Sequence, residues 1–173
     1  MGLSMNEKVV KDYESIDSQV KSAFTREYNK RHSANTTGTG NSALGKGSLG
    51  ANTTASYNTG LGENALLTNT TGASNTAVGN SALYANTTAS NNTAVGTSAL
   101  TANTTGTGNS AVGTLAGAAL TTGSSNTALG HLALDGTDDG AGNTAIGKQA
   151  LSENCGDNNT AVGYLAGLNT TAS

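Results

Sequence analysis

The chain has few of the large side chains that build an ordinary globular core. Its 173 residues include no proline, no tryptophan and one phenylalanine, and aromatic residues make up 3% of the total. Such a composition does not suit a conventional domain core. No apolar run is long enough to span a membrane, and the first residues contain no apolar signal-peptide segment. We therefore expect no membrane span and no export directed by the N-terminus of this chain.

Reactive and charged groups are also scarce. The single cysteine, Cys155, excludes a framework of disulfides within the chain, and His32 and His131 are the only imidazoles. The sequence has no P-loop, no dinucleotide-binding fingerprint and no paired metal ligands. We therefore expect no enzymatic activity and no cofactor. The net charge of −3, without a basic stripe, predicts no nucleic-acid partner.

The chain is dominated by one repeated unit, of which NTAVGNSALYANTTASN (residues 75–91) is a clear copy. The interval between copies is 17 residues six times and 16 once. A period this strict indicates a repeat architecture in which each unit stacks on the next. The copies begin at Asn41, Asn58, Asn75, Asn92, Asn109, Asn126, Asn143 and Asn159.

We number the columns of the unit from 1 to 17, starting at this asparagine. Columns 4 and 9 are aliphatic in nearly every copy, which predicts that both are core columns. Column 4 holds Leu44, Leu61, Val78, Val95, Val112, Leu129, Ile146 and Val162. Column 9 holds Leu49, Leu66, Leu83, Leu100, Leu134 and Leu151. In the fifth copy, Leu115-Ala116-Gly117 suggests that the aliphatic residue has moved two places towards the N-terminus.

Column 5 is glycine in every copy, which predicts a corner that needs a positive φ or a close approach of two backbones. The Asn-Thr-Thr-Gly segment in columns 12 to 15 is typical of a turn. The column 5 glycines are Gly45, Gly62, Gly79, Gly96, Gly113, Gly130, Gly147 and Gly163.

The unit favours short strands over helix, because Gly, Asn and Thr dominate it and its aliphatic residues lie five apart. Adjacent residues of a strand point to opposite faces. We expect the alanine of column 3 to face the inside of its own coil and the aliphatic residue of column 4 to face other chains. The thin core of each coil predicts an obligate oligomer, with three chains the favoured number. Eight coils at about 4.8 Å per strand predict a repeat region roughly 40 Å long.

Residues 1–33 differ from the repeat region at 34–173. They hold six of the eight basic residues and no glycine after Gly2. Apolar residues at helical spacing predict one short N-terminal α-helical segment. It would either join copies of the chain to one another or anchor a fibre in a larger assembly. The residues of the expected anchoring face are Val9, Tyr13, Ile16, Val20 and Phe24.

The repeat region also contains one acidic turn, with Asp135, Asp138 and Asp139. Its spacing does not match a calcium-binding EF-hand loop, because the twelfth position would be Ile146. We interpret it as an acidic surface turn, and we expect no metal site.

Tandem units of the form NTAVGxxALxxNTTGxxN resemble the repeats of bacteriophage tail-fibre and other virion fibre proteins, and more loosely the head repeats of trimeric autotransporter adhesins. The resemblance covers residues 35–173. It implies a homotrimeric, elongated protein that is attached to a virion through an N-terminal segment. The family's C-terminal chaperone or receptor-binding domain has no counterpart here, which favours a short fibre or spike on the capsid or neck over a long tail fibre.

We therefore expect an all-β repeat solenoid, a trimeric β-helix or β-roll fibre, with an N-terminal helical anchor. Its expected role is that of a phage structural protein at the surface of the extracellular virion. Expected partners are further copies of the chain, other proteins of the capsid, neck or tail, and a host surface glycan or receptor. A bacterial trimeric surface adhesin is an alternative. An ice-binding solenoid is a second alternative, because the unit stacks threonines in rows.

Overall fold

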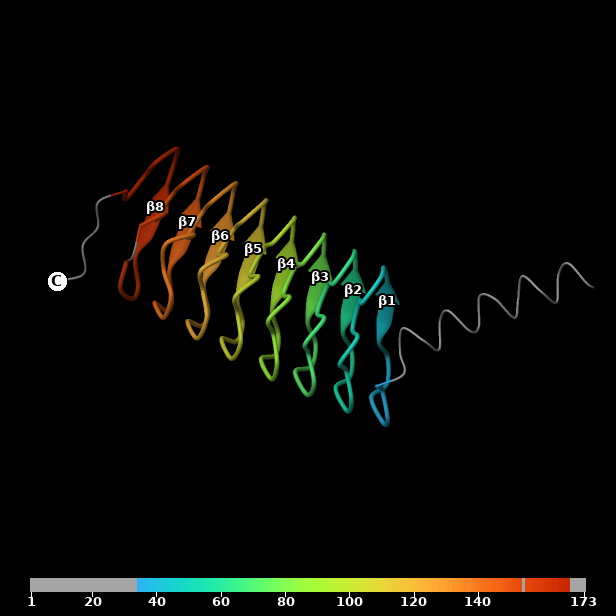
Figure 1. Cartoon of the computed structure of the whole chain (residues 1–173). Coiled ribbons are helices and arrows are strands. Elements are labelled where there is room, and N and C mark those ends of the chain that lie inside the picture. Colours follow the sequence, from blue (N-terminus) through green and yellow to red (C-terminus); the bar gives the residue numbers. More distant parts are fainter. Residues whose placement is uncertain (1–33, 154, 169–173) are drawn as a thin grey trace, which may run out of the picture. The chain divides into compact units, whose positions relative to one another are not determined.

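The computed structural model describes residues 34–153 and 155–168, which wind into an all-parallel β-solenoid (Figure 1). Each coil contributes one strand of three residues, and the strands lie side by side in chain order. This architecture confirms the predicted all-β solenoid. The strands are β1 (Ser42–Leu44), β2 (Thr59–Leu61), β3 (Thr76–Val78), β4 (Thr93–Val95), β5 (Ser110–Val112), β6 (Thr127–Leu129), β7 (Thr144–Ile146) and β8 (Thr160–Val162).

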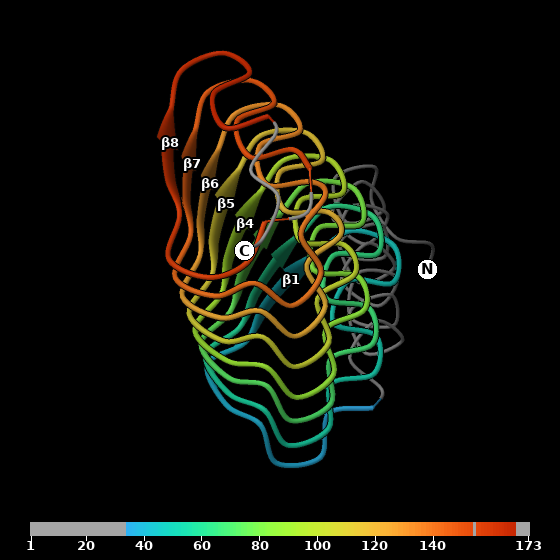
Figure 2. The same ribbon diagram turned by 90° about the vertical axis from the view of Figure 1, so that its left-hand side faces the viewer.

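The register makes each repeat unit one coil of a single chain. Thr76 of β3 pairs with Thr93 of β4, and the same offset of 17 residues holds in the first six ladders. In the last ladder Thr144 pairs with Thr160, an offset of 16. Residues of one column therefore lie directly above one another. Figure 2 shows coils of similar shape one behind another, each displaced a little from the last, with the strands along one side of each coil.

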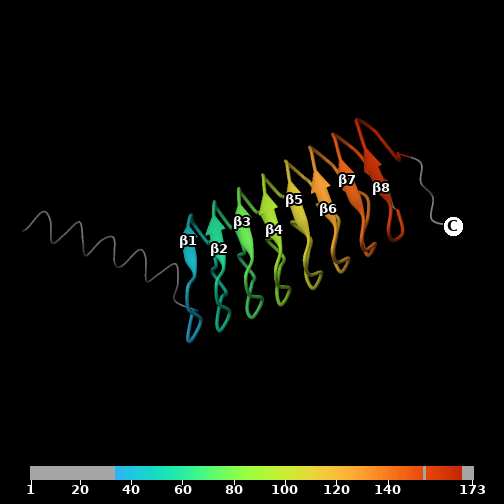
Figure 3. The same ribbon diagram turned by 180° about the vertical axis from the view of Figure 1, so that it is seen from behind.

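Hydrogen bonds between coils continue beyond the strands. Gly62 N donates to Leu44 O at 2.8 Å, and Leu49 N donates to Ala65 O at 3.0 Å. Bonds of this kind recur along the stack that Figure 3 shows from behind. The Gly- and Thr-rich unit thus satisfies its backbone polar groups by stacking on its neighbours, which compensates for its poor intrinsic propensity for regular structure.

The interior of the stack is built from small residues and leucine. The column 3 alanines of β3, β4, β5 and β7 are fully buried, so the predicted inward direction of this column is confirmed. Column 9 is confirmed as a core column, because Leu49, Leu66, Leu83, Leu100, Leu134 and Leu151 are all at most 1% exposed.

Column 9 leucines have an unusual backbone conformation. Leu83 and Leu100 both have φ of 50°. This lies in the left-handed region of backbone conformation, which residues other than glycine rarely occupy. This conformation costs about 1–2 kcal/mol per residue. Full burial of a leucine side chain contributes roughly 1.5–3 kcal/mol. The two terms nearly cancel, so each coil gains little stability from its main core residue.

Two columns of asparagine connect the coils inside the stack. In column 1, Asn75 N donates to Asn58 Oδ1 at 2.9 Å, and Asn75 Nδ2 donates to Ala89 O at 2.8 Å. In column 12, Asn86 Nδ2 donates to Asn69 Oδ1 at 2.8 Å and also to Ala89 O at 3.0 Å. These amides link neighbouring coils, in column 12 as far as Asn103, and they hold the turn that joins columns 12 to 15.

The glycines of column 5 form the predicted corner, with both features that the sequence suggested. Gly96, directly after β4, has φ of +139°. A Cβ atom placed on it would lie 2.4 Å from Gly113 O in the next coil. Column 5 therefore requires glycine both for its backbone conformation and for the close approach of successive coils.

Gly96→Ala should destabilise the stack by about 3 kcal/mol or more, because it combines backbone strain with a clash against the next coil. Gly163→Ala is the matched control, since Gly163 has φ of +129° but the nearest atom to an added Cβ is 3.8 Å away. It should cost less than Gly96→Ala, because it adds backbone strain of about 1–3 kcal/mol without the clash. Thermal unfolding of both variants checks this expectation. Equal losses would mean that the close approach contributes nothing.

The fifth coil fills its interior in a different way. Its column 9 residue is Gly117, and its column 12 residue is Leu120, which is fully buried. A Cβ on Gly117 would lie 3.1 Å from Leu120 Cδ1, so Leu120 fills the space that a column 9 leucine fills elsewhere. Leu115 is only partly buried, so the expected shift of the aliphatic residue by two places is wrong. Because Leu120 replaces the usual asparagine of column 12, the amide ladder of that column ends here. Asn103 Oδ1 therefore has no hydrogen-bond partner.

Placing leucine in column 9 and asparagine in column 12 of this coil, as in the first four coils, should show that positions 117 and 120 are energetically coupled. Gly117→Leu alone overpacks the interior, and Leu120→Asn alone leaves a cavity that costs about 2–5 kcal/mol. The double variant should be as stable as the wild type or more stable, because the introduced amide can donate to the unpaired Asn103 Oδ1. A double-mutant cycle measured by thermal or denaturant unfolding gives the coupling. Additive losses would contradict this account of the coil.

The predicted helix and its apolar face lie outside the described residues. The prediction that Val9, Tyr13, Ile16, Val20 and Phe24 form an anchoring interface therefore stays a prediction.

Candidate interaction surface

The column 4 residues lie on the outer surface of the solenoid. Leu44 and Val162, in the first and last strands, are 63% and 67% exposed, and Leu61 is 42% exposed. The prediction of column 4 as a core column is therefore wrong within a single chain, whereas the expected outward direction is correct. The physical reason is the pleat of the strand, which turns column 3 alanine inwards and its neighbour outwards. The corrected set is Leu44, Leu61, Val78, Val95, Val112, Leu129, Ile146 and Val162, which are exposed or partly exposed.

Column 2 shares this outer face, because residues two apart in a strand point the same way. It holds serine in β1 and β5 and threonine in the other strands. Every one of these residues is exposed or partly exposed. The outer face of the sheet therefore carries two parallel rows, one of hydroxyl groups and one of aliphatic groups. We call the column 4 residues the aliphatic row.

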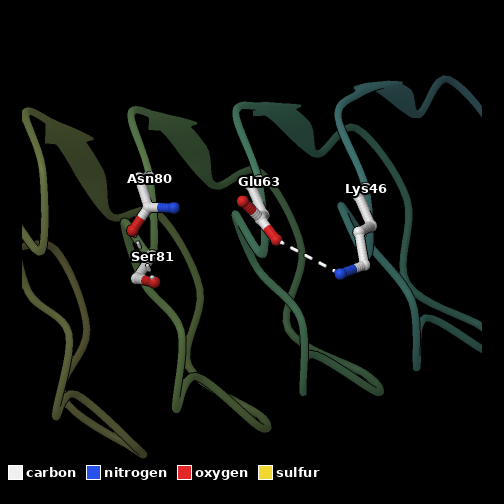
Figure 4. A network of polar contacts seen from close by, with 4 residues as sticks. All are labelled: Lys46, Glu63, Asn80 and Ser81. Atoms are coloured by element: carbon white, nitrogen blue, oxygen red, sulfur yellow. Dashed lines mark hydrogen bonds and ion pairs between the residues drawn. The ribbon is translucent and has the colours of Figure 1, made fainter.

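The two rows are free of charge, and charged residues begin at column 6, just beyond the glycine corner. Figure 4 shows column 6 residues Lys46, Glu63 and Asn80 on three neighbouring coils. Lys46 Nζ lies 3.5 Å from Glu63 Oε1, with the two side chains 86% and 49% exposed. Such an exposed pair contributes little stability. At the other end of this column, Lys148 Nζ lies 5.9 Å from the centre of the Tyr164 ring.

The aliphatic row leaves apolar side-chain surface exposed that would stabilise the protein if it were buried. Half-exposed Val and Leu side chains would contribute about 1 kcal/mol each if a partner covered them, or on the order of 8 kcal/mol for the row. Association itself costs roughly 4–15 kcal/mol. The row is thus of the right size to support association, particularly when flanking columns add to the contact. A continuous exposed apolar row of this kind is typical of an interaction surface.

The acidic turn lies away from the aliphatic row, in columns 10 to 14 of the sixth coil. Asp138 and Asp139 are exposed, and Asp138 accepts a hydrogen bond from the Thr121 hydroxyl. Burial raises the pKa of the Asp135 carboxyl, and the neighbouring His131 partly offsets this effect. No group of three potential metal-binding side chains occurs among the described residues. Nothing in this geometry supports a cation site at the turn.

The shorter seventh coil disturbs the amide ladders locally. In the earlier coils the column 1 amide donates to a carbonyl 14 residues later, as Asn75 does to Ala89 O. One residue is missing here, and Asn143 Nδ2 has no hydrogen-bond partner. Buried Cys155 lies in this coil, with its Sγ 3.0 Å from Thr137 Oγ1. A Thr-Cys contact therefore replaces the column 12 amide ladder at this level.

The structure also contains a two-coil alternation that we did not predict. Ala73 N donates to Ser90 Oγ at 3.0 Å, and Thr107 N donates to Ser124 Oγ at the same distance. The serines involved recur every second coil, at Ser56, Ser90 and Ser124, with threonine or alanine between them. This interval of 34 residues in column 16 is visible in the sequence. It was missed because the shorter period is much stronger.

The chain was compared with protein-family models, curated proteins and solved structures. The described residues include no helix that is long and apolar enough to cross a membrane. No protein-family model, curated protein or solved structure matches the chain.

Proposed function

We propose that this chain is a non-catalytic structural protein of a bacteriophage particle. In this proposal three copies form a short fibre or spike at the surface of the extracellular virion. The N-terminal segment anchors it to proteins of the capsid, neck or tail. The repeat region projects outwards and contributes to host attachment through a surface glycan or receptor.

The observation that carries this proposal is the uniform stacking of the repeat region. Eight strands continue in one register over seven ladders. The column 1 asparagines connect neighbouring coils, as Asn75 does with Asn58, and the column 12 asparagines do so as far as Asn103. Such a structure is a stiff spacer whose length is set by the number of units. The uncharged aliphatic row supports assembly from several copies, and the resemblance of the repeat to virion fibre proteins supports the setting.

Charging the expected anchoring face tests the attachment. Ile16→Asp combined with Val20→Asp should abolish incorporation into particles, because a buried unpaired carboxylate costs several kcal/mol at an apolar interface. The mass of the purified protein should stay that of a trimer. Mass measurement beside a particle-incorporation assay checks both points.

Ser15→Asp combined with Ser18→Asp is the matched control. It adds the same charge to the opposite side of the expected helix and should leave incorporation intact. Normal incorporation of the Ile16/Val20 variant would contradict the anchor. Loss of the trimer in that variant would instead assign the segment to joining copies of the chain.

Ice binding is a second candidate because of the outer face of the sheet. The sequence suggested rows of threonine in columns 2, 13 and 14. In the structure the column 2 row of Thr or Ser lies on parallel strands, two positions from the aliphatic row. A regular, uncharged array of hydroxyl and methyl groups is suited to ordering water. Measurement of thermal hysteresis tests this function, and the virion fibre proposal expects none.

A further inference from the structure

We propose that the aliphatic row is the surface along which copies of this chain pack on one another. The copies lie parallel, with equivalent coils at the same level, so that each column 4 residue meets its own counterpart. This inference rests on the proposed fibre function, because an N-terminally anchored fibre needs all its chains to run in one direction.

The spacing of the row favours another copy of the same chain as the occupant. All eight column 4 residues lie on strands paired in one continuous register. A partner can cover every member of such a row only if its own apolar groups recur at the same interval. A second copy of the chain has column 4 residues at the same spacing, so its aliphatic groups match those of the first copy along the full length of the stack.

Charge is compatible with self-association in this orientation. Columns 2 and 4 hold no charged residue, so no like charges meet where the aliphatic rows face each other. When parallel copies are related by rotation about the stack axis, column 2 of one copy faces column 6 of the next. The hydroxyl row would then lie opposite polar groups such as Glu63, Asn80 and Thr97, which can exchange hydrogen bonds with it.

An antiparallel pair would bring different coils together. Its first coil would face the eighth, and its second would face the seventh. Leu61 would then meet Ile146 instead of a second Leu61, and Glu63 would lie opposite Lys148. The two arrangements therefore differ in which pairs of positions are adjacent across the interface.

Cysteine cross-linking in the full-length protein distinguishes these arrangements. Leu61→Cys should form a covalent dimer with itself under mild oxidation, and so should Ile146→Cys. When the two variants are co-expressed, the mixed Leu61→Cys/Ile146→Cys dimer should be absent. Thr71→Cys is the matched control, since it adds a thiol to an exposed column 14 position of the same coil as Leu61. It should not cross-link. The wild-type protein is the blank, because its only cysteine is buried.

A mass measurement tests the same surface without relying on a disulfide. Val78→Asp combined with Val95→Asp should weaken self-association at least 100-fold and leave the circular dichroism of the fold unchanged. Thr88→Asp combined with Thr105→Asp, on exposed column 14, should leave the mass unchanged. If the Val78/Val95 variant does not fold, the cross-linking result alone decides.

Each other outcome overturns the inference. A mixed dimer without self-dimers would show an antiparallel pair. An unchanged oligomer in the Val78/Val95 variant, with no cross-link at Leu61, would place the contact elsewhere and leave the fibre proposal intact. A wild-type protein that is monomeric and shows thermal hysteresis would assign the row to ice. Normal particle incorporation of the Ile16/Val20 variant would contradict the anchor, and with it the fibre proposal, but it would leave the cross-linking results unchanged.

Discussion

Stacking of coils in a single register is the constraint from which the other features follow. Because each column repeats at the spacing between strands, about 4.8 Å, a residue meets its own kind above and below. Asparagine suits such a column, since its side-chain NH2 can donate within its own coil while its side-chain oxygen accepts from the next coil. Asn75 Nδ2 donates to Ala89 O, and Asn75 Oδ1 accepts from Asn92 N. The Gly-rich corner follows from the same constraint, because the backbone of Gly96 approaches Gly113 too closely for any side chain. A change in one coil is therefore felt first by its neighbours in the column.

Departures from the repeat show how strictly this constraint acts. Where column 9 loses its leucine, at Gly117, column 12 provides Leu120 to fill the same space. The apolar volume is conserved, but the amide ladder ends and Asn103 Oδ1 stays unpaired. The shorter seventh coil similarly leaves Asn143 Nδ2 unpaired. In the fifth coil packing volume is thus maintained at the expense of a hydrogen bond, which agrees with the large cost of a cavity in a thin core.

Much of the fold could be predicted from the sequence because the repeat samples each column eight times. Period, coil size, strand position and the glycine corner all follow from residue types that recur in nearly every copy, and in every copy for the column 5 glycine. The interior could not be predicted as well. The alternation of the strand gave the outward direction of column 4, but it does not apply to column 9, which lies outside the strand. Column 9 points into the coil only because residues such as Leu83 adopt positive φ, a conformation that no propensity for leucine would suggest.

The outward direction of column 4 was predicted correctly from the pleat of the strand, and its burial against other chains stays a prediction. This distinction bears on stability. The inside of each coil is narrow, and its inward columns are limited to alanine, asparagine and a leucine that is partly offset by backbone strain. Larger inward residues would have to separate coils whose spacing the backbone hydrogen bonds already determine. Further apolar burial can therefore come only from outside the coil. Among the described residues the column 4 row is a continuous aliphatic feature on the outside of the coil, so a partner that covered this row would add the burial that the interior cannot supply.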